Sequence, residues 1–125
     1  MIVGIGCDIV EHDITKKLNW GSDLHALNRL FSGKELEIYF AKQDLQFLTG
    51  RFAAKEAFLK CLGTGMRDGI ALPDIQILQL SNGKPTIDLN GEVKNISDNM
   101  GINLWHISIS HSSNYSFALA IAEIV

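Results

Sequence analysis

The start of the chain constrains the possible folds more than any other segment. From Ile2 to Val10 the residues are β-branched, apolar and rich in glycine, which predicts a β-strand. Because alternate residues of a strand point to opposite faces, Gly4 and Gly6 share one face, which ends at Asp8. The opposite face is apolar and is expected to lie in the core; it consists of Val3, Ile5, Cys7 and Ile9.

The glycine face beside Asp8 allows two interpretations. A surface without side chains lets either a ligand or another backbone come close. In the first case, Asp8 lies beside room for a bulky ligand. In the second case, the strand packs tightly on a neighbouring element and Asp8 caps the helix that follows. The pattern of residues is compatible with both.

The rest of the chain interleaves predicted helices with strands that are joined mostly by hairpins. Ser32 and Glu35 match a capping box, which opens a helix expected to run to about Phe47. Further helices are predicted over about 49–62 and 93–100, and strands over 74–80, 86–89, 104–110 and 115–124. Because hairpins dominate, we expect an α+β fold with a mainly antiparallel sheet packed with helices.

The composition indicates one globular domain, residues 1–125, without a nucleic-acid or membrane partner. The formal net charge is -3, whereas a nucleic-acid-binding domain is expected to be basic. No apolar run approaches the roughly 18 residues of a membrane helix, and the N-terminus lacks the basic start of a signal peptide. Cys7 and Cys61 lie far apart and are expected to be free, buried thiols of a cytoplasmic protein.

The segment 50–65 holds the densest group of residues that could carry chemistry. Glu56 and Lys60 are four residues apart and share one face of the predicted helix, and Arg51 and Lys55 are also one turn apart. Such charge pairs are common on solvated helices, where each contributes only about 0.2–0.5 kcal/mol. A purely structural role therefore stays open for this segment.

A glycine loop directly follows this charged helix. It comprises Gly63, Thr64 and Gly65. Glycine loops offer backbone N–H groups to a phosphate, and Lys and Arg supply its counter-charge. A carboxylate such as Glu56 among these groups could hold Mg²⁺, which typically takes one or two carboxylates together with substrate phosphate oxygens. The combination indicates a phosphate site better than the loop alone would.

The segment 106–112 places Ser110 directly before His111. A hydrolase is disfavoured, because the G-x-S-x-G elbow is absent and adjacent strand residues point to opposite faces. At the mouth of a hairpin, His111 suits a phosphate or ribose contact. A structural histidine fits the pattern as well.

Four motifs follow one another along the chain. They are residues 4–11 (GIGCDIVE), 50–60 (GRFAAKEAFLK) with 63–65 (GTG), 83–85 (GKP) and 108–112 (SISHS). Together they closely resemble the holo-acyl-carrier-protein synthases, the single-domain group of the 4′-phosphopantetheinyl transferase family. The resemblance covers nearly the whole chain in the same order.

The resemblance implies a 4′-phosphopantetheinyl transferase-like fold that assembles as a homotrimer, with coenzyme A held between neighbouring protomers. It assigns Mg²⁺ to Asp8 and Glu56, and it places His111 across the subunit boundary. The residues that it assigns to the coenzyme A site are Arg51, Lys60, Gly63, Thr64, Gly65, Lys84, Pro85 and His111.

The implied reaction moves the phosphopantetheine arm of coenzyme A onto a serine of apo-acyl carrier protein, in support of fatty acid biosynthesis. The serine hydroxyl attacks the β-phosphorus, and 3′,5′-ADP leaves. Asp8, Glu56 and Lys60 are the expected catalytic residues. Lys60 would offset charge on the phosphates, and Glu56 is the candidate base for the serine proton.

Carrier docking is expected to need a basic surface, because carrier proteins are acidic. The family often has an arginine shortly after its first motif, where this chain has Ile14. Lys16, Lys17 and Arg29 are the candidate replacements.

Two other functions remain possible at this stage. One is a non-catalytic sensor that binds coenzyme A or a nucleotide on the same trimeric scaffold. The other is an interaction protein whose charged helix is merely solvated. The presence of both Asp8 and Glu56 favours the transferase, because a pure binder does not need a metal site with two carboxylates.

Overall fold

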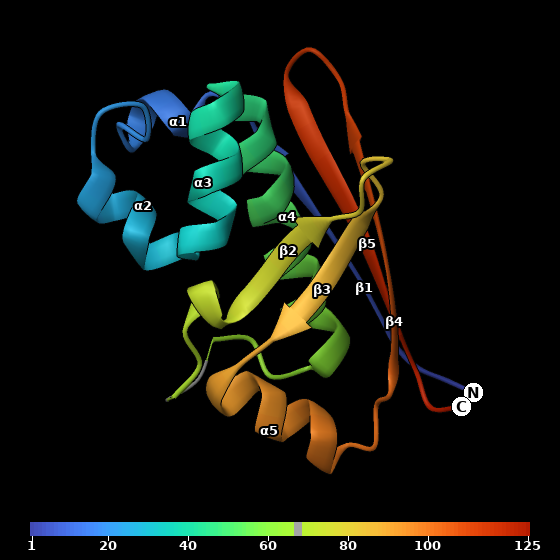
Figure 1. Ribbon diagram of the computed structural model, residues 1–125. Coiled ribbons are helices and arrows are strands. Elements are labelled where there is room, and N and C mark those ends of the chain that lie inside the picture. The colour runs from blue at the N-terminus through green and yellow to red at the C-terminus, as the bar shows by residue number, and fades with distance from the viewer. Residues whose placement is uncertain (67–68) are drawn as a thin grey trace.

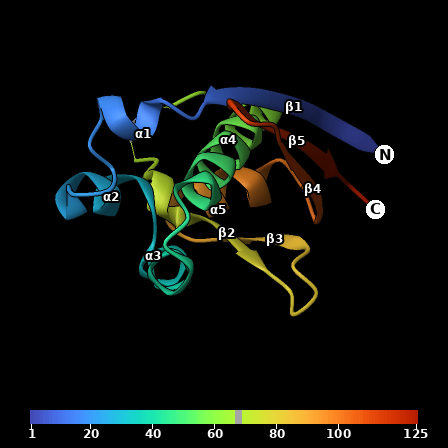
Figure 2. The same ribbon diagram turned by 90° about the horizontal axis from the view of Figure 1, so that it is seen from above.

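A long central helix, α4 (Leu45–Leu62), lies between two antiparallel sheets in the computed structural model, which describes residues 1–66 and 69–125 (Figure 1). One sheet has the strand order β1–β5–β4, and the other is the hairpin β2–β3 on the opposite side of the helix (Figure 2). The strands are β1 (Ile2–Glu11), β2 (Ile75–Gln79), β3 (Pro85–Leu89), β4 (Leu104–His111) and β5 (Tyr115–Glu123). The predicted α+β fold with antiparallel pairing is confirmed.

The other α-helices in the described ranges are shorter than α4, and a 3₁₀ helix, η1 (Leu72–Asp74), precedes β2. The shorter α-helices are α1 (Ile14–Lys17), α2 (Leu24–Leu30), α3 (Gly33–Lys42) and α5 (Gly91–Asn99). The first three gather on one side of α4, and α5 lies near its C-terminal end (Figure 1). Within the described ranges, no helix has the length and apolar character needed to cross a membrane.

The start of α3 matches its prediction and the end does not. The Glu35 carboxylate accepts a hydrogen bond from the backbone N–H of Ser32 at 2.8 Å, and the Ser32 hydroxyl accepts one from the N–H of Glu35 at 3.2 Å. The helix stops at Lys42, short of the expected end near Phe47, because Gln43 is left-handed with φ +53°. Asp44 then caps α4 by accepting from the N–H of Gln46, so one predicted helix becomes parts of two.

Strand β1 shows the reverse of its predicted burial. The apolar face that was expected in the core is exposed in the single chain, with Ile5 62% and Ile9 63% exposed. Cys7 on this face is also exposed, contrary to expectation, whereas Cys61 is buried. The glycine face is the one that packs inward, so the pattern of apolar residues alone chose the wrong side.

The glycines of β1 let the backbone of α4 approach directly. A methyl group on Gly4 would collide with the carbonyl of Cys61, and one on Gly6 would lie 2.7 Å from the N–H of Cys61 and collide with the carbonyl of Ala57. The neighbouring strand β5 is equally small on this face; it presents Ala118, Ala120 and Ala122, all fully buried. The close neighbour of the glycine face is therefore another backbone, and the interpretation as room for a ligand is wrong.

A buried ion pair joins α3, α4 and β2. Lys55 Nζ donates to Glu35 Oε1 at 2.7 Å and to the carbonyl of Leu72 at 2.8 Å, and both charged side chains are inaccessible to solvent. The other Glu35 oxygen accepts from the N–H of Ile77 at 2.9 Å. Burial lowers the pKa of Lys55, and the charge of Glu35 opposes this shift. Lys55 therefore stabilises the fold and is not part of an open phosphate-binding face with Arg51.

The close contact of β1 with α4 predicts that Gly6→Ala destabilises the protein. The added methyl group meets helix backbone, which cannot rotate away as a side chain can, so we expect a loss of about 1–3 kcal/mol or more in the free energy of unfolding. Chemical denaturation measures this loss. Gly21→Ala is the matched control, because open space surrounds that position; equal stability of the two variants would contradict the proposed packing.

Candidate functional site

A groove of about 600 Å³ lies where the end of β1 meets α1 and α4. It brings together Asp8 and Glu56, the two carboxylates that the sequence analysis assigned to one site. The residues that line it are Asp8, Ile9, Val10, Glu11, Asp13, Ile14, Lys17, Phe52 and Glu56.

Lys60 lies at this site through a direct contact with Asp8. Its Nζ donates a hydrogen bond to Asp8 Oδ1 at 3.1 Å, and 57% of the Lys60 side chain remains exposed. This hydrogen bond, together with the negative charge of Asp8, raises the pKa of Lys60. Lys60 is therefore a cation that remains accessible to a further anionic partner.

Glu56 lies in an electrostatically unfavourable position. Partial burial raises its pKa, the nearby charge of Asp8 raises it further, and the charge of Lys60 lowers it. Two neighbouring carboxylates with one shared ammonium group leave an excess of negative charge. A cation bound between them would relieve this repulsion.

The donor set of the groove fits Mg²⁺ held jointly with a substrate. Mg²⁺ usually takes one or two carboxylates and completes its shell with water and phosphate oxygens, which is what Asp8 and Glu56 can offer. In the described part of the chain, no group of three or more His, Cys, Asp or Glu side chains could hold an ion. The remaining ligands would have to come from substrate and solvent.

The glycine loop begins directly after α4, one turn beyond Lys60. Gly63 ends the helix with φ +74°, and its N–H donates to the carbonyls of Leu59 and Lys60. Gly65 also has a positive φ of +58°. These left-handed conformations favour glycine. Among residues 1–66 and 69–125, nothing lies within 4 Å of a side-chain position at either glycine.

Arg51 points away from the groove, toward β2. Its Nε donates to the carbonyl of Ile77 at 3.3 Å, its Nη2 donates to Gln79 Oε1 at 3.0 Å, and the guanidinium lies 4.2 Å from the centre of the Phe47 ring. Burial lowers its pKa to about 10, so it remains a cation at neutral pH. Lys84 and Pro85 belong to the β2–β3 hairpin, on the opposite side of α4 from β1 (Figure 2).

His111 lies at the end of β4, over the N-terminal half of α4. A side chain on Gly50 would come within 2.7 Å of its Cε1, so the ring occupies space that only a glycine leaves open. Its Nδ1 lies 2.7 Å from the buried hydroxyl of Ser116. Burial, followed by the charge of His12, lowers the pKa of His111. Neither Arg51 nor His111 is among the residues that line the groove of Asp8 and Glu56, called the acidic groove below.

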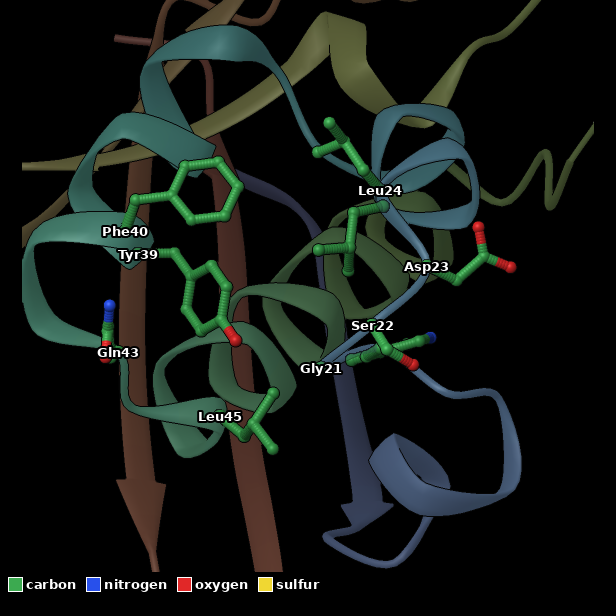
Figure 3. A pocket seen from close by; sticks show the side chains of 10 residues that line it. Gly21, Ser22, Asp23, Leu24, Tyr39, Phe40, Gln43 and Leu45 are labelled. Atoms are coloured by element: carbon green, nitrogen blue, oxygen red, sulfur yellow. The ribbon is translucent and has the colours of Figure 1, made fainter.

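A separate cavity of about 470 Å³ lies between α2 and α3 (Figure 3). Its lining has no lysine or arginine and consists of Trp20, Gly21, Ser22, Asp23, Leu24, Leu27, Tyr39, Phe40, Gln43 and Leu45. The Trp20 ring meets the edge of Phe52 at 5.7 Å between centres, and Phe52 also lines the acidic groove. The aromatic pair therefore belongs to the walls of both spaces. None of the described residues that line the cavity is a cation that could neutralise a diphosphate.

The sequence analysis missed several side chains that shape these sites. Phe52 was quoted only as part of a motif, although it forms a wall of the groove. The helical spacing of Phe52 and Glu56 would have placed them on one face. Ser116 and Thr49, which meet through their hydroxyls at 2.9 Å, come from distant segments, and no local pattern indicates such a contact.

Comparison with known proteins identifies the relatives of this chain. Residues 4–120 match the model of the 4′-phosphopantetheinyl transferase superfamily. A holo-[acyl-carrier-protein] synthase of Geobacillus is 40% identical, with 98% of each chain covered. The sequence resemblance is thereby confirmed.

Solved structures agree with this family. The holo-[acyl-carrier-protein] synthase of Neisseria meningitidis superposes with a TM-score of 0.87 at 32% identity, covering 98% of this chain and 99% of that one. The Bacillus anthracis synthase, in complex with coenzyme A (3′,5′-ADP), gives a TM-score of 0.79 at 32% identity, with 100% and 99% covered.

The charges around the groove predict that substitutions of Asp8 and Lys60 shift the pKa of Glu56 in opposite directions. Asp8→Asn should lower the pKa of Glu56, because it removes a neighbouring negative charge, and Lys60→Met should raise it, because it removes the positive one. Carboxyl ¹³C NMR titration of Glu56 measures both shifts. Asp98→Asn on α5 serves as the control, and a Glu56 titration insensitive to Asp8 and Lys60 would mean that the groups are not neighbours.

Proposed function

Because the chain belongs to the 4′-phosphopantetheinyl transferase superfamily, we propose that it transfers the 4′-phosphopantetheine group of coenzyme A to a serine of apo-acyl carrier protein. The products are holo-acyl carrier protein and 3′,5′-ADP. One observation carries the proposal: Asp8 and Glu56, from distant parts of the chain, line one groove, and Lys60 contacts Asp8 beside it, in a fold that matches holo-[acyl-carrier-protein] synthases along its whole length.

The residues of the groove can bind and orient a diphosphate. Asp8 and Glu56 would hold Mg²⁺, which when bound supplies positive charge to the pyrophosphate oxygens. Lys60 keeps one exposed ammonium beside Asp8 and would neutralise a further phosphate oxygen. Phosphoryl transfer depends mainly on positioning and charge neutralisation, so these three side chains meet its principal needs.

Glu56 is the candidate base for the serine proton. The serine oxygen forms a bond to the β-phosphorus as the bond to the leaving 3′,5′-ADP breaks, and the hydroxyl proton passes to a nearby base. Burial and the charge of Asp8 raise the pKa of Glu56 in the metal-free chain, and bound Mg²⁺ would oppose this shift, so the assignment as base rests on the place of Glu56 in the groove. The transfer would occur directly or through a bridging water.

We further propose that the active protein is a homotrimer with sites between its subunits. Asp8, Glu56 and Lys60 lie at one groove, whereas Arg51 and His111 lie away from it. Lys84 and Pro85, in the β2–β3 hairpin, lie away from it too. A site between two neighbouring copies of the chain would let one coenzyme A molecule contact both groups.

The exposed face of the three-stranded sheet supports this assembly. It carries apolar side chains that a stable monomer would be expected to cover; they include Val3, Ile5, Ile9, Tyr115 and Phe117, with exposed fractions of 37–63%. A contiguous apolar surface of this kind marks an interaction site. A second and third copy of the chain would bury it.

Carrier docking at the groove would rely on few cations. Ile14, at the position where the family often has arginine, lines the groove together with Lys17. Lys17 also pairs with Asp13 at 3.4 Å. We therefore assign the basic contact at the groove to Lys17 and leave Lys16 and Arg29 as more distant candidates.

Two free thiols, Cys7 and Cys61, are compatible with a reducing compartment. We therefore propose that the reaction takes place in the cytoplasm, in support of fatty acid biosynthesis.

Transfer is tested by incubating the protein with coenzyme A, Mg²⁺ and apo-acyl carrier protein. The carrier should gain the mass of one phosphopantetheine group. Asp8→Ala and Glu56→Ala should each lower the rate at least about 100-fold with little change in melting temperature, because each removes a metal ligand. Asp98→Asn is the control. If the mass of the carrier stays unchanged while the protein still binds coenzyme A, the transferase is contradicted and the non-catalytic coenzyme A sensor is supported.

Assembly is tested by Ile5→Asp on the exposed face of β1. A charge in an apolar interface is costly to bury, so this variant should sediment as a monomer and lose transfer activity, while the wild type sediments as a trimer. Leu18→Asp is the matched control, because Leu18 is exposed but lies outside the sheet. A wild-type protein that is monomeric at micromolar concentration and fully active would contradict the trimer.

A further inference from the structure

The buried hydroxyl of Ser116 connects two histidines and a threonine. Its Oγ lies 2.7 Å from His111 Nδ1, 2.9 Å from His12 Nε2 and 2.9 Å from Thr49 Oγ1. Ser116 is fully buried, so bulk water does not compete for these contacts. The cluster joins the ends of β1, β4 and β5 to the start of α4, outside the acidic groove.

The number of available protons limits how this cluster can be arranged. A serine hydroxyl has one proton to donate and can accept two hydrogen bonds. All three contacts form only if Ser116 donates to one neighbour and accepts from the other two. The Thr49 hydroxyl has its own acceptor, the carbonyl of Gln46 at 3.0 Å, so donation from Thr49 to Ser116 would weaken that bond.

His12 imposes a second restriction. Its Nδ1 lies 3.2 Å from the carbonyl of Ser113. A carbonyl only accepts, so this contact favours a proton on Nδ1, which leaves Nε2 of a neutral ring as an acceptor for the Ser116 proton. Suppose that His12 is neutral and that Ser116 donates to His111. Both His12 and Thr49 must then donate to Ser116, so the hydrogen bond from His12 to the Ser113 carbonyl is lost and the one from Thr49 to the Gln46 carbonyl is weakened. If Ser116 donates to His12 or to Thr49 instead, at most one of these two hydrogen bonds is affected.

In both of the better arrangements, Ser116 accepts from His111, which therefore carries a proton on Nδ1. The ring is also fixed in place, because it fills the space above Gly50. Within residues 1–66 and 69–125, no hydrogen bond to His111 Nε2 is formed, and the residue is exposed. The neutral ring thus presents an open lone pair to solvent at Nε2.

We propose that Ser116 is a positioning residue that fixes the tautomer of His111, so that an anionic group of coenzyme A binds at Nε2 only together with a proton. The proposal rests on the proposed function for the identity of the anion. A lone pair repels a phosphate oxygen, whereas a protonated Nε2 donates a charge-assisted hydrogen bond to it. Binding therefore takes up one proton per site.

The surroundings of His111 determine the direction of the pH dependence. Burial and the charges of His12 and Arg51 lower its pKa, and Asp44 at the start of α4 opposes them. The free ring is therefore mostly neutral at neutral pH, and a bound phosphate raises its pKa. Affinity for coenzyme A is greatest below the pKa of the free protein, and it falls as the pH rises toward the pKa of the complex.

The tautomer is tested in the free protein by ¹⁵N NMR of His111. The wild type should show a protonated Nδ1 and an unprotonated Nε2 in the neutral ring. Ser116→Ala should lose this preference, and Ser116→Thr, which keeps the hydroxyl, should retain it. Ser113→Ala is the matched control from the same hairpin. A wild-type ring with its proton on Nε2, or an unchanged tautomer in a folded Ser116→Ala protein, would overturn the proposal.

Proton uptake is tested by calorimetry of coenzyme A binding in buffers of different ionisation enthalpy. The wild type should take up a proton near neutral pH and His111→Gln should not. Ser116→Ala frees the neutral ring to carry its proton on Nε2, so this variant should take up less than one proton per site on binding coenzyme A, with kcat nearly unchanged. Absence of uptake in the wild type refutes the proposal even if Ser116→Ala fails to fold. If the wild type takes up a proton on binding coenzyme A but does not modify the carrier protein, the proposed transferase activity is refuted and the role of Ser116 is not.

Discussion

The contact between the glycine face of β1 and the backbone of α4 determines the geometry of the site. Gly4 and Gly6 leave no side chain between strand and helix, and a methyl group at either position would collide with helix backbone. This closeness brings Asp8 within hydrogen-bond distance of Lys60. The glycines therefore set the geometry of the groove through packing, since a wider spacing would separate Asp8 from the charged groups of α4.

The cationic side chains of α4 differ in their surroundings according to the helix face on which they lie. Lys55 is fully buried against Glu35 and ties α4 to α3 and β2, while Arg51 is held by β2. Only Lys60, near the end of the helix, remains exposed beside Asp8. Removing one partner of a buried ion pair typically costs about 3–5 kcal/mol, so Lys55 belongs to the packing of the helix that carries Glu56.

The sequence was sufficient for the features that depend on local spacing or on a long motif. The helical spacing of Glu56 and Lys60 and the capping box at Ser32 are of this kind. The burial of β1 could not be predicted, because its more apolar face is exposed in the single chain and small residues fill the inner one. Contacts such as that between Ser116 and Thr49 depend on tertiary packing, which no local pattern encodes.

The central claim is that Asp8 and Glu56 bind one divalent ion, and Mn²⁺ as a paramagnetic substitute tests it most directly. Adding Mn²⁺ and coenzyme A to isotopically labelled protein should broaden NMR signals at the end of β1 and in the middle of α4, with the strongest effect on the carboxyl carbons of Asp8 and Glu56. Broadening centred on other residues, or at only one of these two carboxylates, would contradict a shared metal site.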